Sequence, residues 1–149
     1  MYDSEIGLEI LKEQNASREV TLMVLDILMD FMNDNATELK KPESVYMERI
    51  VIHILSSVLR CAQSESALIA VFAAVRHSVV MFCNAYFIDP TPFCGAITYG
   101  ILRHCNSSSP VILGKATALF YLLIHVRFLF PHSFISHAHS NTRPRCKSG

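Results

Sequence analysis

Apolar residues recur at steps of three and four positions along most of this chain, and no alternation with a period of two lasts long enough to indicate a sheet. Such spacing places the apolar residues on one face of an α-helix. Short polar segments join the stretches that show it. The pattern therefore predicts an all-α fold, either a helical bundle or part of an α-solenoid.

About five helices are expected, and three of them have a clear start signal. Ser17 and Ser109 are predicted N-caps, because a serine hydroxyl can accept a hydrogen bond from an unpaired backbone N–H of the first turn. A further helix is expected to begin at about Ser64. Pro42 and Pro110 suit the first turn of a helix, where the missing N–H is not needed. Helix starts near residues 17, 42, 64, 92 and 109 give pairs of roughly 45 residues, near the armadillo and HEAT repeat lengths. No repeated residue pattern accompanies that spacing.

Each helix has an expected core face. In chain order these faces are Val20, Val24, Ile27 and Phe31; Val45, Ile50, Val51, Ile54, Leu55, Val58 and Leu59; Leu68, Val71, Phe72, Val75, Val79 and Phe82; Phe93, Ile97, Ile101 and Leu102; and Val111, Ala116, Leu119, Phe120 and Leu123. The methionines and aromatic residues at helical spacing are also interpreted as core, namely Met23, Met29, Met32, Phe72, Phe82, Phe120 and Tyr121.

The charges are divided unevenly, although 13 Lys and Arg balance 13 Asp and Glu. Residues 1–50 hold 11 acids and 5 bases, whereas residues 51–149 hold 2 acids and 8 bases, and no acid follows Asp89. A neutral total argues against a nucleic-acid-binding module, which normally carries a strong basic excess. An apolar share of 51% with only 5 Gly and 6 Pro residues argues against a disordered chain.

The compartment is expected to be cytoplasmic. The N-terminus is acidic and lacks the layout of a signal peptide. Five cysteines without close pairs are interpreted as reduced thiols and not as a disulfide framework. The stretch after Val111 is apolar enough to suggest a membrane span until Lys115, His125 and Arg127 are counted. A protein without a transmembrane segment is the default expectation.

The sequence offers little catalytic chemistry. It has no Gly-rich phosphate loop, no nucleophile elbow and no zinc-binding His-Glu-x-x-His helix. His104 and Cys105 are adjacent, but neighbouring helical residues point about 100° apart, so we interpret them as a surface histidine beside a buried cysteine. Cys83 and Cys94 flank one loop and are interpreted as core thiols, because a zinc site needs four ligands. We expect no catalytic, cofactor-binding or metal-binding residue and no cofactor.

The C-terminal residues hold four of the seven histidines. His137 and His139 could chelate a metal if the chain is extended there, but no acid or paired cysteine supports them. Arg143, Arg145 and Lys147 form a mildly basic end. A solvated tail is the favoured interpretation.

Three segments resemble a known family. Ser17–Phe31, Gln63–Val79 and Cys94–Ile124 are similar, in this order, to the dedicator-of-cytokinesis (DOCK) family of exchange factors, and most of all to its zizimin-type branches. The similar region lies in the long helical, armadillo-like part just before the catalytic DHR-2 domain. Cys94, Tyr99, Leu102, Cys105, Asn106 and Ser107 carry one motif, and Ala118, Phe120, Tyr121, Leu122 and Leu123 approximately fit the next.

The resemblance implies a role in signalling by Rho-type small GTPases. The family catalyses nucleotide exchange on Rac or Cdc42 through DHR-2 and binds phosphoinositide through an upstream DHR-1 domain. Neither domain is expected within these 149 residues, so no catalytic residue of the family is carried over. The chain is therefore expected to be a fragment or short isoform that supplies non-catalytic helical scaffold, with protein contacts through its helical surface and possible self-association.

The family pattern stops in the middle of the last helix. The resemblance covers roughly residues 1–124, more loosely at Met1–Asn15 and Asn33–Met47, and this part carries 13 acids and 9 bases. Residues 125–149 depart from the family pattern and carry 4 bases and no acid. We expect residues 1–124 to form the scaffold and residues 125–149 to form a divergent, disordered tail. The hypothesis for its origin is an alternative exon, a retained intron or an altered reading frame.

Two other functions stay open. One is a stand-alone helical adaptor of the armadillo or HEAT kind, unrelated to exchange. The other is a small cysteine-dependent enzyme that uses Cys105 or Cys94, which a single unusually reactive thiol would support.

Overall fold

The computed structural model describes residues 2–41, 44–61, 64–87 and 92–129, and all of the regular structure in them is helical. The prediction of an all-α fold is confirmed. Five long helices carry the fold, because η1, a π-helix, continues directly into α3 and because α2 and α5 are single short turns. The elements are α1 (Tyr2–Asp34), α2 (Ala36–Leu39), η1 (Met47–Ile52), α3 (His53–Arg60), α4 (Glu65–Met81), α5 (Cys83–Phe87), α6 (Pro92–His104) and α7 (Pro110–Leu129).

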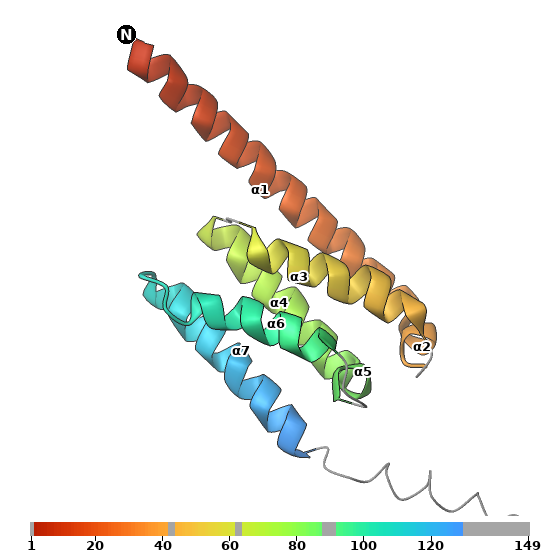
Figure 1. Ribbon diagram of the computed structural model, residues 1–149. Helices are drawn as coiled ribbons and strands as arrows, with labels where there is room; N and C mark the ends of the chain where they lie inside the picture. Colours follow the sequence, from red (N-terminus) through yellow and green to blue (C-terminus); the bar gives the residue numbers. More distant parts are fainter. Residues whose placement is uncertain (1, 42–43, 62–63, 88–91, 130–149) are drawn as a thin grey trace, which may run out of the picture.

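The long helices form two layers, and α4 is at the centre (Figure 1). One layer holds α1, α4 and α7, with α4 in contact with both neighbours. The other layer holds α3 and α6, which contact each other. Contacts between α3 and α4, and between α6 and α7, join the layers. The antiparallel pairs α3–α4 and α6–α7 therefore each contribute one helix to each layer.

A single apolar core fills the space between the layers. Its fully buried members include Met32, Leu55, Val75, Ile97 and Ile101. All six residues of the predicted face of α4 are buried, which confirms that face: Leu68, Val71, Phe72, Val75, Val79 and Phe82. Helix α4 also buries Ala67, Ala74 and Ser78, because it has neighbours on several sides.

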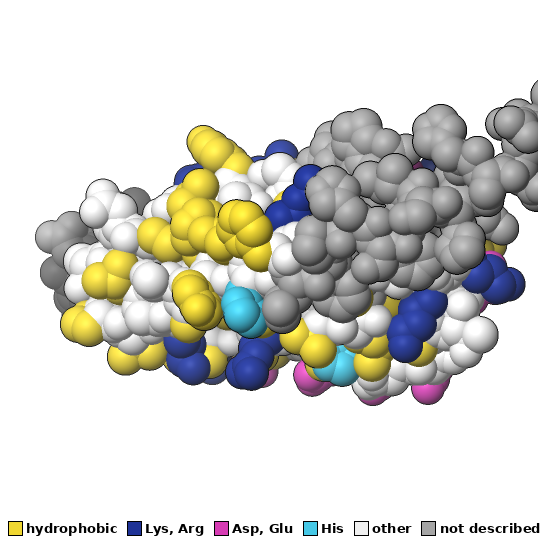
Figure 2. Space-filling view, turned by 90° about the horizontal axis from the view of Figure 1, so that it is seen from below, with side chains coloured by type: hydrophobic (Ala, Val, Ile, Leu, Met, Phe, Trp, Pro, Cys, Tyr) yellow, Lys and Arg dark blue, Asp and Glu magenta, His cyan; other side chains and the backbone are white. Residues whose placement is uncertain are grey.

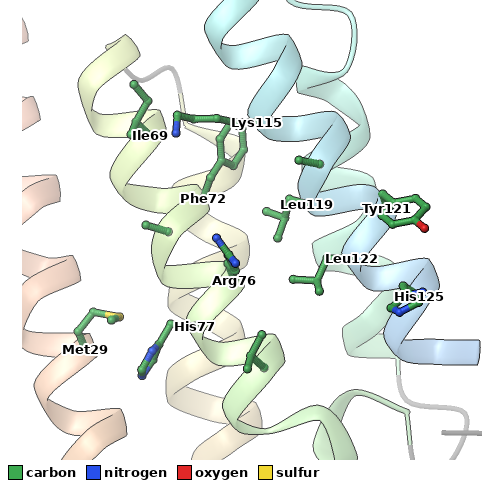
Figure 3. A pocket seen from close by; sticks show the side chains of 13 residues that line it. Met29, Ile69, Phe72, Arg76, His77, Lys115, Leu119, Tyr121, Leu122 and His125 are labelled. Atoms are coloured by element: carbon green, nitrogen blue, oxygen red, sulfur yellow. The ribbon is translucent and has the colours of Figure 1, made fainter. Parts of the chain in front are cut away.

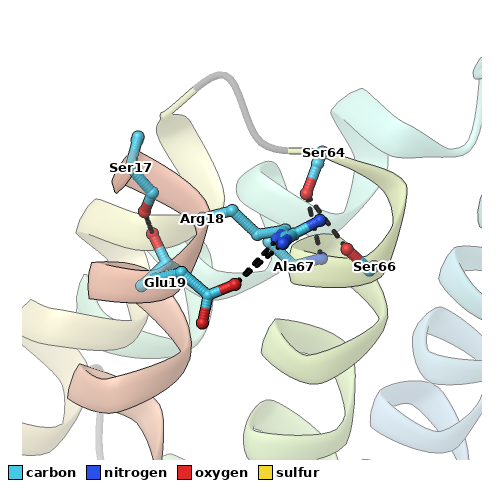
Figure 4. Close-up of polar contacts among 7 residues, drawn as sticks. Ser17, Arg18, Glu19, Ser64, Ser66 and Ala67 are labelled. Carbon is cyan, nitrogen blue, oxygen red and sulfur yellow. Dashed lines mark hydrogen bonds and ion pairs between the residues drawn. The ribbon is translucent and has the colours of Figure 1, made fainter. Parts of the chain in front are cut away.

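The predicted N-cap at Ser109 is present, and Ser64 caps the helix that was expected to begin at about that residue. The Ser64 hydroxyl accepts a hydrogen bond from the Ala67 N–H at 3.4 Å, which caps α4 (Figure 4). The Ser109 hydroxyl accepts from the Ile112 N–H at 3.4 Å and donates to the Glu65 carboxylate at 2.7 Å. Ser109 therefore both begins α7 and fastens it to the first turn of α4.

The predicted start of the first helix is wrong. Ser17 is not an N-cap, because α1 begins at Tyr2 and Ser17 lies inside it, where its carbonyl accepts a hydrogen bond from the Thr21 hydroxyl at 2.9 Å (Figure 4). Its predicted core face is also displaced, since Val20 and Ile27 are 59% and 63% exposed. The buried residues of α1 are Thr21, Leu25, Leu28 and Met32. Apolar residues occupy almost every position in this part of α1, so their spacing fits two neighbouring faces equally well. The predicted face and the buried face differ by one residue, which is about 100° around the helix.

Five other residues predicted to be core lie at the surface. Val45, Leu102 and Val111 are exposed, each at the edge of an otherwise buried face, and Met23 and Tyr121 are exposed on the outer sides of their helices. The expected helix start at Pro42, the loop at Asp89 and Pro90, and the side chain of Phe93 lie outside the described residues.

Helix α7 is long and apolar enough to cross a membrane by length and composition alone. Over Pro110–Phe128 its mean hydropathy is 1.5, and 28% of that stretch is buried. The same helix packs against α4 and α6 and carries Lys115 and Arg127. It continues past Ile124, with Val126 buried, and the Arg127 guanidinium donates to the Phe87 carbonyl at 3.1 Å. Residues 130–149 lie outside the described residues.

Candidate functional site

A groove of about 810 Å³ lies between α1, α4 and α7. Figure 3 shows its side chains arriving from all three helices, with α4 between the other two. Three helices far apart in the sequence therefore make one surface, and no local motif marks it. The lining residues are Met29, Ile69, Phe72, Ala73, Arg76, His77, Val80, Lys115, Ala118, Leu119, Tyr121, Leu122 and His125.

The floor of the groove is apolar. Phe72 and Leu119 are buried at its base, and Ile69 and Leu122 are half-buried beside them. Val80 is 59% exposed, and the phenol ring of Tyr121 is 67% exposed on α7. This mixture of covered and open apolar side chains is typical of a surface that can accept an apolar partner.

The walls of the groove are basic. Arg76 on α4 and Lys115 on α7 are both exposed, and Figure 3 shows Lys115 extending from α7 towards Ile69. None of the described side chains that line the groove is acidic. Figure 2 shows Lys, Arg and His side chains next to hydrophobic ones on one face of the molecule. The groove therefore combines an apolar floor with a positive rim.

Two histidines complete the walls. The Nε2–H of His77 donates to the Asn33 carboxamide oxygen at 3.1 Å, which ties α4 to α1. The His125 ring stacks on the Tyr121 ring, with centroids 5.8 Å apart and planes inclined by 15°.

His104 and Cys105 do not form a nucleophile and base. The Nε2–H of His104 donates to the Leu59 carbonyl at 3.2 Å, and its ring meets the Phe72 ring edge-on at 5.6 Å. The imidazole is half-buried, so its interpretation as a surface histidine holds only in part. Cys105 is also half-buried and packs against the core. His104 thus joins α6 to α3 and α4.

The four cysteines in the described ranges are free thiols. Cys61 is exposed, and Cys83, Cys94 and Cys105 are half-buried, so the interpretation of Cys83 and Cys94 as core thiols holds only in part. Within the residues that the structure describes, no three His, Cys, Asp or Glu side chains gather where they could hold a metal. His137 and His139 lie outside those residues.

A buried polar pair joins α4 to α5. The Ser78 and Tyr86 hydroxyl groups are 2.7 Å apart, and the two residues are 0% and 1% exposed. Burial raises the pKa of Tyr86 well above its ordinary range, the bond to Ser78 opposes that rise, and Cys94 adds a smaller upward effect. Tyr86 is therefore neutral in the folded protein, and its hydroxyl stabilises the turn after α4.

Replacing Tyr86 with phenylalanine is expected to lower the free energy of unfolding by about 1 to 2 kcal/mol at neutral pH, because the buried Ser78 hydroxyl loses its partner. The wild type should also lose stability above about pH 10, since the unfolded chain then releases the Tyr86 proton while the folded chain keeps it. In that range the free energy of unfolding of the wild type should fall by about 1.4 kcal/mol per pH unit. This alkaline slope should be absent in Tyr86→Phe. Urea denaturation followed by circular dichroism measures both effects.

The matched control is Tyr99→Phe, because Tyr99 is 64% exposed. It should leave both the stability at neutral pH and the alkaline slope unchanged. An alkaline slope that is the same in wild type and in Tyr86→Phe would contradict the assigned burial effect.

Comparison with curated proteins finds relatives over most of the chain. Dedicator of cytokinesis protein 11 of Danio rerio is 34% identical over 128 residues, which cover 85% of this chain. Dedicator of cytokinesis protein 7 of Mus musculus is 30% identical over 131 residues, 88% of this chain. Dedicator of cytokinesis protein 9 of Homo sapiens is 30% identical over 127 residues, 85% of this chain. The family resemblance seen in the sequence is thereby confirmed.

The match covers a small part of each relative. This chain spans about 6% of the length of the curated proteins that it matches. No protein-family model matches the chain. No solved structure matches it either.

Proposed function

Because this chain belongs to the dedicator-of-cytokinesis family, we propose that it serves Rho-type GTPase signalling as a non-catalytic helical scaffold of an exchange factor. The observation that carries the proposal is the similarity over 85% of the chain. The aligned length exceeds that of any one helix, so it includes the packing between helices that a scaffold needs. We also propose that the chain comes from the zizimin-type branch of the family and that it lies just before the catalytic DHR-2 domain in the full-length protein.

The two-layer packing supports a scaffold role. Helix α4 contacts α1, α3, α5 and α7, so displacing any one of these helices disturbs the shared core. The pair α3–α4 contacts the pair α6–α7 through α3 with α6 and α4 with α7. We propose that these pairs are repeat units and that the chain forms a segment of an armadillo-like solenoid. A segment of this kind fixes the spacing of the domains on either side and presents a surface for protein contacts.

We propose that GTPase binding belongs to the full-length protein. Rac or Cdc42 would bind to DHR-2, and the helices of this chain would orient that domain in the cytoplasm. Residues 1–124 are proposed as the part of the scaffold that follows the family, and residues 125–149 as a divergent end, of which residues 125–129 complete α7. No cofactor is proposed, because exchange by such a factor needs protein contacts with the GTPase alone.

The test is a nucleotide-release assay with Rac and Cdc42 loaded with a fluorescent nucleotide. Addition of this chain is expected to leave the release rate at its spontaneous value. A catalytic DHR-2 domain from a relative is the positive control. Concentration-dependent acceleration by this chain alone would overturn the non-catalytic part of the proposal.

The groove favours one alternative, a stand-alone adaptor that binds a partner without any role in exchange. A chimera separates the two functions. In Dedicator of cytokinesis protein 11 of Danio rerio, the matched segment is replaced by the corresponding residues of this chain. Exchange at the rate of the unmodified protein supports the scaffold, whereas a folded chimera without exchange supports the adaptor.

A further inference from the structure

We propose that two copies of this chain associate by exchanging helices, with the first half of α1 from each copy docked in the groove of the other. Residues 5–16 are called the α1 arm below. The inference goes beyond the proposed function, since neither surface requires a GTPase. It rests on the exposure of the arm, on the character of the groove and on the charges of both.

The α1 arm is an uncovered helix. Figure 1 shows α1 continuing well beyond the other helices towards its N-terminus. The apolar side chains of the arm are 47% to 57% exposed, and these are Ile6, Leu8, Ile10 and Leu11. Four such residues in a short stretch form an apolar surface that the chain itself leaves open to water.

The arm also carries an acidic stripe. Glu5, Glu9 and Glu13 follow one another at steps of four residues, so their side chains lie along one side of the helix. Ile6 and Ile10 have the same spacing one position later and lie directly beside that stripe. Within the described part of the chain none of the three glutamates forms an ion pair. An apolar stripe next to an acidic one needs a groove with an apolar floor and a basic edge.

The groove between α1, α4 and α7 has that character. Its floor is formed by side chains such as Phe72 and Leu119, and its rim carries Arg76 and Lys115. Neither basic residue forms an ion pair with a described side chain. A helix in an apolar groove is a common mode of recognition, in which apolar side chains supply affinity and charges at the rim set orientation.

The arm of the same copy cannot reach this groove. Helix α1 is unbroken over 33 residues, a length of about 50 Å, and its second half is packed on α4 through Leu25, Leu28 and Met32. The arm therefore points away from the groove that its own second half borders. An arm from another copy can enter it, and reciprocal exchange between two copies gives a closed, symmetric dimer.

The experiment is sedimentation equilibrium of the full chain in low salt with a reducing agent. We expect a dimer that weakens as salt is added, because exposed charge pairs are screened. Two variants reverse one surface each: Arg76→Glu with Lys115→Glu in the groove, and Glu5→Lys with Glu9→Lys and Glu13→Lys in the arm. Each variant alone should raise the dimer dissociation constant by more than about tenfold, or about 1.4 kcal/mol.

An equimolar mixture of the two variants is the decisive sample. In a mixed pair the basic arm meets the acidic groove, and the acidic arm meets the basic groove, so both contacts are again complementary. The mixture should recover the wild-type dissociation constant. The control is Arg49→Glu with Arg103→Glu, which makes the same charge change at exposed sites outside the arm and the groove and should leave the dimer intact.

Circular dichroism checks that each variant folds, and all seven substituted residues, those of the control included, are exposed. A wild-type chain that stays monomeric would overturn the inference, as would assembly beyond a dimer. A dimer that both variants leave unchanged, or a mixture that fails to recover it, would do the same. None of these results changes the expected outcome of the nucleotide-release assay, so the two proposals fail separately.

Discussion

Replacing Phe72 with alanine is expected to lower the free energy of unfolding by about 3 to 5 kcal/mol. The Phe72 side chain is only 4% exposed, at the point where α4 faces both α6 and the groove. Its ring meets the His104 ring edge-on, so truncation removes an aromatic contact together with apolar packing. The free energy of unfolding of a folded domain is about 5 to 15 kcal/mol, so the variant should lose a large share of its stability.

Val80→Ala is the matched control for that variant. Val80 lies on the same helix but is 59% exposed, so its truncation should change stability by less than about 0.5 kcal/mol. Urea denaturation followed by circular dichroism gives both values. A loss below about 1 kcal/mol for Phe72→Ala would show that α4 is not the packing centre of the fold.

A methyl group added at Gly100 is expected to destabilise the protein by about 1 to 3 kcal/mol. A Cβ atom at this position would lie 3.0 Å from the Leu59 Cβ and 3.1 Å from the Leu59 Cδ1. Leu59 is buried and cannot move aside, so α6 would have to shift away from α3. That strain exceeds the gain of about 1 kcal/mol that alanine brings in a helix interior.

Gly95→Ala, on the same helix, is expected to change the stability in the opposite direction. No heavy atom lies within 4 Å of a Cβ placed at Gly95, so only the helix preference remains and stability should rise by up to about 1 kcal/mol. Thermal denaturation of the two variants measures the difference in sign. Equal shifts in the same direction would mean that α3 and α6 are not closely packed at Gly100.

Local chemistry explains which parts of the fold could be predicted. The cap at Ser109 could be predicted because an N-cap needs only a hydroxyl and the backbone N–H groups of the next turn. The buried face of α4 was found because its apolar residues keep one spacing over the whole helix. By contrast, the polar residues around Ser17 suggested a helix start, although the helix simply continues through them.

The candidate site could not be predicted from local patterns. Met29, Arg76 and Lys115 lie on three helices, and only the packing of α1 and α7 on opposite sides of α4 brings them together. One signal was present: α4 has no acid after Glu65, and α7 has none at all. The shortage of acids indicated that α4 and α7 have a positive surface. The sequence did not show where that surface lies relative to the apolar residues, because this depends on how the helices pack.

Hydrogen exchange measured by mass spectrometry tests the central claim most directly, namely that α4 holds both layers together as a preformed scaffold. The amides of α4 are expected to exchange more slowly than those of any other described helix, at rates set by opening of the whole fold. Slow exchange in α4 with intermediate rates in α3, α6 and α7 is the predicted result. Exchange of α4 at the rate of an unstructured peptide of the same sequence would contradict the account.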